Sequence, residues 1–387
     1  MYQRIKRCDL KPGMYVVSYG LGTFDSPLVQ VDKPMLGPAQ IDEHVPADVE
    51  SVLVDNSIHI SLLGQARPVG VPVTTSLGEE LPIAKRLYTD ALVHVRSFVD
   101  DVRRGTDIDY RKATPLVQNF IESVFRNEAA AVTLFKLRGF DEYTYTHSIN
   151  VSILAVLLGK HLDLDKPALL KLGLAGMYHD VGKAKIPESI LNKPGKLSES
   201  EFQAMKAHPL EGYRIMRGQA DLDPEILRAV VEHHERHDGS GYPRGLKAQD
   251  IGRFSRIIAV VDVYDALTSK RVYKDAIAPA KALGMMYQWR DKDFPPQAIE
   301  HFIRCIGVFP VGSLVRLSGG EYGIVTSVSS ARPTKPEVKV VLDSKMRPQL
   351  PRILDLWAVE GTPEAQDVAE VLNPAAHKID LERFFSA

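Results

Sequence analysis

The sequence is poor in cysteine: Cys8 and Cys305 are the only two among its 387 residues. They lie far apart in the chain, so no disulfide framework is expected, and such sparse cysteine is typical of a reducing compartment. Neither cysteine lies near the part of the chain where histidine and aspartate recur. Thiolate ligands are therefore not expected in a metal site formed there.

A long apolar run is also missing. A helix that crosses a bilayer needs about 20 consecutive apolar residues, and stretches such as residues 257–261 are bounded by charged side chains. The first 13 residues are charged and end in Pro12-Gly13, unlike a secretory signal. We therefore expect a soluble, cytoplasmic protein that does not use a membrane.

Neither sign of charge is in excess. The formal net charge is -1 and the pI is near 6.9, whereas a protein that binds a nucleic-acid polymer needs a broad Lys/Arg surface. No nucleic-acid polymer is therefore expected as a partner. A small dianionic nucleotide is compatible with this composition, because a few well-placed cations suffice to bind it.

The composition is that of a globular protein, with 44% hydrophobic and 25% charged residues, and the length suggests two or three domains. Residues 1–75 carry short strand signals at 14–18 and 52–54, in a setting rich in Pro and Gly. They predict a small β-rich or mixed domain with a regulatory or interaction role.

Residues 76–113 predict a helical linker with a heptad-like seam. Its apolar residues recur at alternating spacings of three and four, which suits packing against another helix: Leu81, Ala84, Tyr88, Ala91, Val95, Phe98 and Val102. Three heptads are at the lower limit for predicting a coiled coil. Two interpretations stay open: the seam packs within its own chain, or it faces a second subunit in a homodimer.

Residues 114–310 predict an all-helical domain. Pro115 suits the first position of a helix, Ser198 with Glu201 fits a capping box, and Pro224 opens a helix that ends at His233-His234. His208 precedes a proline, so we expect it outside helical geometry, at a junction between helices.

Residues 311–387 predict a small β appendage, with strands at 314–317, 323–328 and 338–342, followed by a short helical tail. The expected fold class is therefore mainly α, with a small β-containing part at each end of the chain.

Histidine and aspartate form an ordered series inside the helical part. The adjacent pair His179-Asp180 ends an apolar helix and is followed by His208, by His233-His234 and by Asp262. Neutral imidazole combined with carboxylate suits Fe, Mn, Zn or Ni rather than Ca, which prefers an all-oxygen shell. The series therefore predicts a metal centre.

This series resembles the HD-GYP family, the bacterial phosphodiesterases of cyclic di-GMP within the HD phosphohydrolase superfamily. An HD dipeptide alone is weak evidence, whereas the ordered set is very specific. The opening residues, 5–19, are similar to a domain of unknown function often placed before HD-GYP domains. The matching catalytic segments are residues 143–148, 179–183 and 186–197, His208-Pro209, residues 233–243 with the Gly241-Tyr242-Pro243 element, and residues 262–269.

The resemblance implies a binuclear site in which Asp180 bridges two ions. His147, His179 and Asp262 would serve one ion, and His208, His233 and His234 the other. The supply of ligands agrees, because seven such residues exceed what one four- to six-coordinate ion uses with room for water and substrate. The expected cofactors are two divalent transition-metal ions, Fe or Mn first, with Zn and Ni as alternatives.

Two finer points concern the ligands. Neighbouring helical residues point about 100° apart, so His233 and His234 cannot aim identically, and one of them can be a weaker or indirect ligand. Asp265 shares a helix face with Asp262 and can orient a ligand from behind it. The alternative for Asp265 is a cap or a buried hydrogen bond with Thr268. The other histidines that match no ligand position are expected to be structural or solvated: His44, His59, His94, His161, His301 and His377.

The implied chemistry is hydrolysis of a phosphodiester, in which two cations lower the pKa of a water molecule and neutralise charge on the phosphoryl oxygens. Lys183 is the candidate to contact the scissile phosphate or to help protonate the leaving ribose oxygen. Arg271 and Lys274 match positions that hold the substrate's phosphates. Gly241, Tyr242 and Pro243 lie in a loop where the tyrosine can hydrogen-bond or stack near a guanine. The same loop is implied to bind partners such as a diguanylate cyclase.

One position departs from part of the family. Members that hold three metals carry a Glu one helical turn before the first histidine ligand, whereas Tyr143 stands four residues before His147 here. A phenol is a poor ligand near neutral pH because its unperturbed pKa is about 10. Glu142 points about 100° away around the helix. We therefore expect two metals per chain.

Three functional hypotheses follow. The first is an active phosphodiesterase that converts cyclic di-GMP to the linear dinucleotide pGpG, with GMP as a further product left open. The second is an HD phosphohydrolase that acts on another cyclic dinucleotide or nucleotide. The third is a non-catalytic receptor for cyclic di-GMP, which the complete set of principal ligand positions disfavours.

Overall fold

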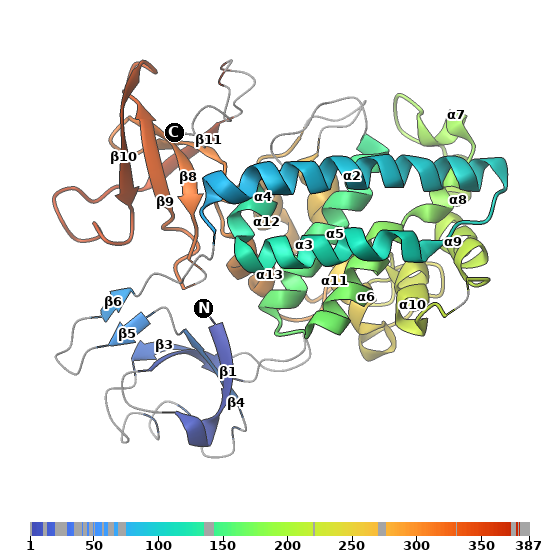
Figure 1. Ribbon diagram of the computed structural model, residues 1–387, viewed down its shortest axis with the longest axis horizontal. Helices are drawn as coiled ribbons and strands as arrows, with labels where there is room; N and C mark the ends of the chain where they lie inside the picture. Colours follow the sequence, from blue (N-terminus) through green and yellow to red (C-terminus); the bar gives the residue numbers. More distant parts are fainter. Residues whose placement is uncertain are drawn as a thin grey trace. The chain divides into compact units, whose positions relative to one another are not determined.

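The computed structural model describes most of the chain in segments (Figure 1). These are residues 2–10, 14–19, 29–34, 51–55, 58–60, 66–68, 75–134, 143–219, 221–269, 276–329 and 331–372, together with the single residues Ile41, Val45, Val49, His377 and Ile379. Contacts divide the chain into two units, residues 1–74 and 75–387.

The first unit contains a four-stranded antiparallel sheet with the order β1-β4-β2-β3. The strands are β1 (Tyr2–Lys6), β2 (Tyr15–Tyr19), β3 (Val29–Pro34) and β4 (Ser51–Asp55), and a separate pair is formed by β5 (Ile58–Ile60) and β6 (Ala66–Pro68). Val16 of β2 lies opposite Val54 of β4, and both are fully buried in a small apolar core. The strands predicted at 14–18 and 52–54 are thus present as β2 and β4.

The second unit is mainly helical, as predicted. Its α-helices are α2 (Leu77–Arg104), α3 (Thr114–Arg126), α4 (Glu128–Leu134), α5 (Tyr143–His161), α6 (Lys166–Tyr178), α7 (Glu188–Leu191), α8 (Glu199–Met205), α9 (His208–Met216), α10 (Pro224–Glu232), α11 (Arg253–Thr268), α12 (Pro279–Gln288) and α13 (Ala298–Ile306). Helices α5 and α6 pack against each other and are buried on nearly every side, as expected of helices whose apolar residues cover the whole circumference.

Several helix starts follow the predicted capping signals. Ser198 accepts a hydrogen bond from the Glu201 backbone, and the Glu201 side chain accepts from the Ser198 backbone, which makes a capping box at α8. Proline stands in the first turn of α3 and of α10. The prediction that His208 lies outside helical geometry is wrong: it sits at the junction of α8 and α9, but as the first residue of α9. Pro209 is tolerated there because the N–H it lacks would have no partner in a first turn.

Helix α2 packs against α3, α4 and α5 of its own chain. Ala91 and Val95 of the seam are fully buried, and Phe98 is 4% exposed. Glu80, also fully buried, accepts hydrogen bonds from Arg126 Nε at 2.7 Å and Ser123 Oγ at 2.6 Å on α3. The seam therefore packs within the chain, and the interpretation in which it faces a second subunit is not supported. The segment predicted as a linker is part of the helical body.

The C-terminal part of this unit is a five-stranded antiparallel sheet with the order β10-β9-β8-β7-β11. The strands are β7 (Leu314–Leu317), β8 (Tyr322–Ser327), β9 (Glu337–Leu342), β10 (Pro348–Asp355) and β11 (Val368–Leu372). The first three match the predicted strands, whereas β10 and β11 were not predicted. The helical tail predicted after residue 360 is not found in residues 361–372, where the chain forms β11, and residues 373–387 lie nearly all outside the described residues. No helix in the described part of the chain is long and apolar enough to span a membrane.

Candidate metal centre

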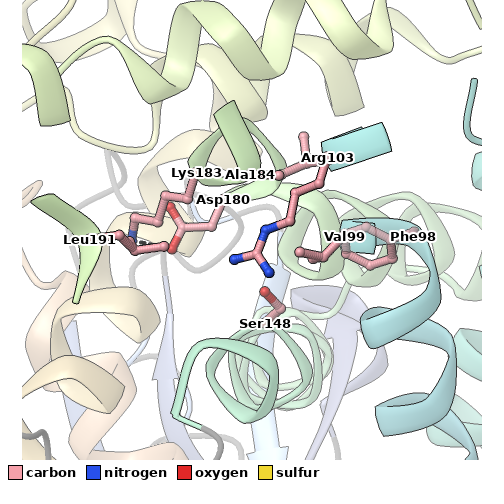
Figure 2. Close-up of a pocket in the computed structure, with 9 residues that line it drawn as sticks. Phe98, Val99, Arg103, Ser148, Asp180, Lys183, Ala184 and Leu191 are labelled. Atoms are coloured by element: carbon pink, nitrogen blue, oxygen red, sulfur yellow. Dashed lines mark hydrogen bonds and ion pairs between the residues drawn. The ribbon is translucent and has the colours of Figure 1, made fainter. Parts of the chain in front are cut away.

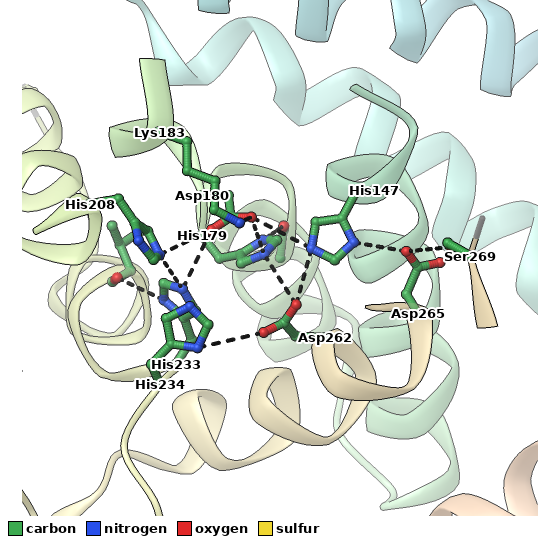
Figure 3. A network of polar contacts seen from close by, with 12 residues as sticks. His147, His179, Asp180, Lys183, His208, His233, His234, Asp262, Asp265 and Ser269 are labelled. Carbon is green, nitrogen blue, oxygen red and sulfur yellow. Dashed lines mark hydrogen bonds and ion pairs between the residues drawn. The ribbon is translucent and has the colours of Figure 1, made fainter. Parts of the chain in front are cut away.

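The predicted ligands meet at one place although they come from five helices (Figure 3). His147 is on α5, His179 and Asp180 directly follow the end of α6, and His208 begins α9. His233 and His234 follow the end of α10, and Asp262 lies in α11. All of these residues except His234 are buried. Helix ends therefore supply most of the side chains, which lets them enter the interior at different angles.

Gly182 brings two of these helix ends together. It is the second residue of the 3-10 helix η3 (Val181–Lys185), a helix that begins directly after Asp180. A Cβ at this position would stand 1.9 Å from the carbonyl oxygen of His208 and 2.5 Å from the Gly212 nitrogen, so a larger residue does not fit. This close approach places Asp180 Oδ1 3.2 Å from His208 Nε2.

The imidazoles are oriented by bonds on their outer nitrogens. The Nδ1 atoms of His179, His208 and His233 lie 2.7, 2.8 and 2.9 Å from backbone carbonyl oxygens three residues earlier in the chain. A carbonyl only accepts, so Nδ1 carries the proton and Nε2 of the neutral ring is left as a ligand atom. The three Nε2 atoms face the centre of the cluster (Figure 3).

Asp180 joins two groups of ligand atoms. Its Oδ2 is 3.3 Å from His179 Nε2 and 3.5 Å from His147 Nε2, whereas its Oδ1 is 3.2 Å from His208 Nε2 and 3.6 Å from His233 Nε2. One group able to hold an ion contains His147, His179 and Asp180; the other contains Asp180 and the three remaining histidines. The two carboxylate oxygens are thus divided between the groups.

Asp262 also reaches both halves of the cluster. Its Oδ1 lies 3.0 Å from His147 Nε2 and 3.9 Å from His179 Nε2, and its Oδ2 lies 3.8 Å from His234 Nδ1. His233 and His234 present different nitrogens but converge on the same group, with ring centroids 4.1 Å apart. The 100° spacing of neighbouring helical residues does not set the directions of these two side chains, because α10 ends at Glu232 and both residues lie in the turn that follows.

The charges around the cluster are strongly perturbed. Burial by itself would raise the pKa of Asp180 and of Asp262. Lys183 and neighbouring imidazoles hold the Asp180 pKa well below its usual range, and the hydrogen bond to His147 together with the charges of the nearby imidazoles does the same for Asp262. Burial lowers the pKa of His233 to about 4. At His147 burial also acts to lower the pKa, but hydrogen bonds to Asp262 and Asp265 outweigh it and raise the value to about 9. Ionised carboxylates and the neutral His233 imidazole suit a transition-metal ion, and such an ion would compete with the proton on the His147 ring.

Two buried polar atoms support the same conclusion. Within the described part of the chain, His179 Nε2 and Asp180 Oδ1 make no hydrogen bond of acceptable geometry. Buried polar atoms are nearly always satisfied, so an unsatisfied pair on facing ligands calls for an explanation. Cations held by the two ligand groups would provide one, since His179 Nε2 belongs to the first group and Asp180 Oδ1 faces the histidines of the second. The His/Asp cluster could therefore hold metal ions.

Asp265 supports His147 from behind. Its Oδ2 lies 2.8 Å from His147 Nδ1 and accepts a hydrogen bond from Ser269 Oγ at 3.1 Å, and the residue is fully buried. The Thr268 hydroxyl donates instead to the Tyr264 carbonyl. The geometry therefore matches the orienting role rather than the bond to Thr268.

The Gly-Tyr-Pro loop lies against the second ligand group. The Tyr242 ring centroid is 4.8 Å from that of His234 and 6.4 Å from that of His208. A Cβ on Gly241 would stand 2.4 Å from the Arg236 nitrogen, so only glycine permits this turn. Pro243 follows a cis peptide bond. The loop thus places an aromatic ring at the edge of the cluster.

Two glutamates anchor this loop, although no sequence motif had marked them as site residues. Glu232 is fully buried and accepts hydrogen bonds from Gly252 N at 2.7 Å and Ser255 Oγ at 3.1 Å, and it pairs with Arg244. Glu235 accepts from the backbone nitrogens of Arg244 and Leu246 at 2.7 and 2.9 Å. The sequence did offer one sign that Glu232 is buried: it stands at a core-facing position of an apolar helix, just before the histidine pair.

A small pocket opens beside Asp180 on the side facing α2 (Figure 2). Lys183, which forms an ion pair with Asp180 Oδ2, lies on its wall. Arg103, which the sequence analysis did not select, reaches into it from the last turn of α2. Three side chains discussed from the sequence lie outside the described residues: the predicted phosphate-binding Arg271 and Lys274, and Tyr143.

The histidines expected to be structural are placed away from the cluster where they are described. The His94 ring nitrogen lies 2.9 Å from the Tyr178 hydroxyl, and His161 packs edge-on against His301 at 5.7 Å between centroids. His377 is exposed. His44 and the side chain of His59 lie outside the described residues.

Comparison with known proteins places the chain in a family. The model of the HD domain matches residues 127–297. A cyclic di-GMP phosphodiesterase of Pseudomonas aeruginosa is 35% identical over 370 residues, which is 92% of this chain and 89% of that protein. The cyclic di-GMP phosphodiesterase response regulator RpfG of Xanthomonas campestris is 35% identical over 209 residues, 52% of this chain and 55% of that protein. A 3'3'-cGAMP-specific phosphodiesterase of Vibrio cholerae is 39% identical over 148 residues, 38% of this chain and 33% of that protein.

The helical fold and the His/Asp cluster define an HD-domain hydrolase. Within this class, the chain belongs to the HD-GYP family of cyclic di-GMP phosphodiesterases, as the near full-length relative shows.

Proposed function

We propose that this protein is a metal-dependent phosphodiesterase that hydrolyses cyclic di-GMP to pGpG and so lowers the concentration of this bacterial second messenger. The observation that supports this most strongly is the joining of two ligand groups at the Asp180 carboxylate. It occurs in a chain that is 35% identical, over 92% of its length, to a protein named a cyclic di-GMP phosphodiesterase.

The cofactors we propose are two divalent transition-metal ions, iron or manganese, with zinc and nickel as alternatives. His147, His179 and Asp262 would hold one ion, His208, His233 and His234 the other, and Asp180 both. When bound, such a pair activates water for attack and neutralises charge on the phosphoryl group.

The chain's own residues would bind and orient the substrate. The Lys183 ammonium, which forms an ion pair with Asp180, would contact the scissile phosphate or help protonate the leaving ribose oxygen. The Tyr242 ring, beside His234, offers a surface on which a guanine can stack. Burial raises the pKa of Tyr242, so its hydroxyl stays protonated as a donor. By family resemblance, Arg271 and Lys274 would hold the phosphates.

A second candidate substrate is another cyclic dinucleotide. A relative named as specific for 3'3'-cGAMP is 39% identical over 38% of this chain. The third hypothesis, a non-catalytic receptor, is disfavoured because each described ligand position carries a residue able to bind metal. Binding of a diguanylate cyclase or another signalling protein to the Gly-Tyr-Pro loop stays a prediction.

The proposal is tested by incubating purified protein of defined metal content with cyclic di-GMP, 3'3'-cGAMP and cyclic di-AMP and resolving the products by chromatography. We expect pGpG from cyclic di-GMP, and the same chromatograms show whether GMP follows. Exclusive turnover of a different dinucleotide would select the second hypothesis. Tight binding of cyclic di-GMP without any product would select the receptor.

A further inference from the structure

The pocket beside Asp180 is built partly by α2, which precedes the residues that match the HD domain model. Its walls are largely aliphatic: Val99 from α2, Val181 and Ala184 from η3, and Leu191 from α7. The Ser148 hydroxyl lies on the opposite side from η3 (Figure 2). Apolar walls with a few polar groups suit a flat heterocycle better than a free phosphate.

Arg103 is the forked donor of this pocket. Figure 2 shows its guanidinium pointing between Lys183 and Ser148. Its side chain is 32% exposed, and in the described part of the chain its ion pair is with Glu188, at 3.4 Å. Glu188 is 69% exposed, so this pair is weak and does not prevent Arg103 from binding a ligand.

The end of α2 is held firmly against the metal-bearing segment. Lys185 Nζ of η3 donates to the Val102 carbonyl at 2.7 Å, and the Phe98 ring lies 4.8 Å from the Tyr178 ring, the residue before His179. Both contacts involve residues of α2 that directly precede Arg103 or lie about one turn before it. They fix the base of the Arg103 side chain relative to Asp180.

We propose that Arg103 recognises the guanine base next to the scissile phosphate and thereby selects guanine over adenine. This inference rests on the proposed function, because it assumes a cyclic dinucleotide at the metal centre. Guanine presents two acceptors, N7 and O6, on one edge, whereas adenine presents the N7 acceptor and an N6 donor. A guanidinium only donates, so it matches both guanine atoms and is opposed by the adenine amino group.

Arg103 would therefore be a specificity residue contributed by α2, in addition to the cations named from the family motif. The phosphate at the metal centre already has Lys183 beside it. The enclosed volume of the pocket, about 20 Å³, holds only a water molecule, so the base would lie in the open mouth against the aliphatic wall, where the guanidinium would meet its edge.

The test compares kcat/KM for cyclic di-GMP and cyclic di-AMP in wild-type protein and in Arg103→Gln, Arg103→Lys and Arg104→Gln. Arg104 is the matched control, because it carries the same charge in the same helical turn, is exposed and does not line the pocket. Metal content and melting temperature are measured for every variant, so that a folding defect is recognised.

We expect Arg103→Gln to lower the preference for cyclic di-GMP over cyclic di-AMP by about tenfold or more, since a bidentate contact to a base discriminates by this amount. Arg103→Lys should fail to restore the preference, because lysine keeps the charge but lacks the fork. Arg104→Gln should leave it unchanged.

An equal loss for both substrates in Arg103→Gln would overturn the inference and indicate a phosphate contact instead. Full rescue by lysine, or an unchanged preference, would overturn it as well. A wild-type protein that hydrolyses neither dinucleotide would contradict the proposed function itself, which separates the two failures.

Discussion

At the scale of single residues, Asp180 has the position on which the centre depends. Its two oxygens face different pairs of histidines, and each pair is oriented by separate bonds on its outer nitrogens. Removing one oxygen's charge would therefore affect both halves of the cluster. Few other substitutions in the described site would do so, since His147 and His208 each belong to one group.

Asp180→Asn should lose both metals and activity together. The amide has a single neutral oxygen donor, so it cannot serve two ions as a carboxylate does. Loss of a residue that only orients a ligand costs about 10–100-fold in metal affinity or activity, and we expect the loss here to exceed this range. Elemental analysis and a turnover assay on the same sample check the result. Full metal content with wild-type turnover would show that Asp180 does not join the two sites.

Asp265→Asn should weaken the first ion without removing the second. The amide is neutral, so it holds the His147 ring less firmly than the carboxylate, which lies 2.8 Å from Nδ1. We expect metal affinity to fall by about 10–100-fold at one of two sites. Calorimetric titration with Mn²⁺ distinguishes the sites. Ser269→Ala is the milder comparison, because it removes the hydrogen bond from Ser269 Oγ to Asp265 and leaves the Asp265 carboxylate in place. Metal affinities that match those of the wild-type protein at both sites of Asp265→Asn would contradict the assigned role.

The ligands could be predicted from the sequence because the motif fixes residue type and order together. The helix ends at His179, His208 and His233 also fix the outer bonds of the rings, since each reaches a carbonyl three residues back. Arg103 could not be predicted in this way. It lies far before Asp180 in the chain, and no local pattern distinguishes it from the exposed Arg104 beside it.

At the scale of elements, α2 is the first helix of the second unit and reaches the pocket with its last turn. Its first turn is held by the ion pair between buried Glu80 and Arg126. The seam between these two ends is apolar and covered by α3, α4 and α5. The position of Arg103 therefore depends on contacts along the whole helix.

Arg126→Ala should destabilise the helical unit by about 1–3 kcal/mol, because it leaves the buried Glu80 carboxylate without its charged donor. Chemical denaturation measures the change. Arg86→Ala is the control, since Arg86 is exposed on α2, the helix that carries Glu80, and its loss should cost within about 0.5 kcal/mol. Equal, small effects for both variants would show that the ion pair does not stabilise the docking of α2.

The helices were predictable where their ends carry a chemical signal, as at Ser198 and Pro224. The partner of the α2 seam was not, because an apolar stripe looks the same whether it packs on its own chain or on a second one. Strand β10 was missed because Pro348 and Pro351 interrupt its pattern. It is an edge strand, the place where proline is tolerated in a sheet.

At the scale of the whole molecule, a catalytic body of helices carries the complete described cluster, and β-sheet parts lie before and after it in sequence. The Pseudomonas aeruginosa relative is similar over 92% of the chain, so this similarity includes much of both flanking parts. The first unit has an apolar core of its own, built by Val16, Val45, Val52 and Val54 with their neighbours. Its regulatory or interaction role stays a prediction.

The metal count is a property of the whole active protein. Two ligand groups are present in the described residues, and they share Asp180. By family resemblance, a third ion would need an anchoring carboxylate one turn before His147, where the sequence has Tyr143. A phenol with an unperturbed pKa of about 10 does not supply that charge near neutral pH.

The most direct test is a titration of metal-free protein with Mn²⁺, or with Fe²⁺ under anaerobic conditions, that follows the conversion of cyclic di-GMP to pGpG. We predict that turnover is absent without metal and reaches its plateau at two equivalents per chain. A plateau at one equivalent, or a need for a third, would contradict the shared centre at Asp180. Two firmly bound ions without any turnover of cyclic di-GMP would contradict the proposed function.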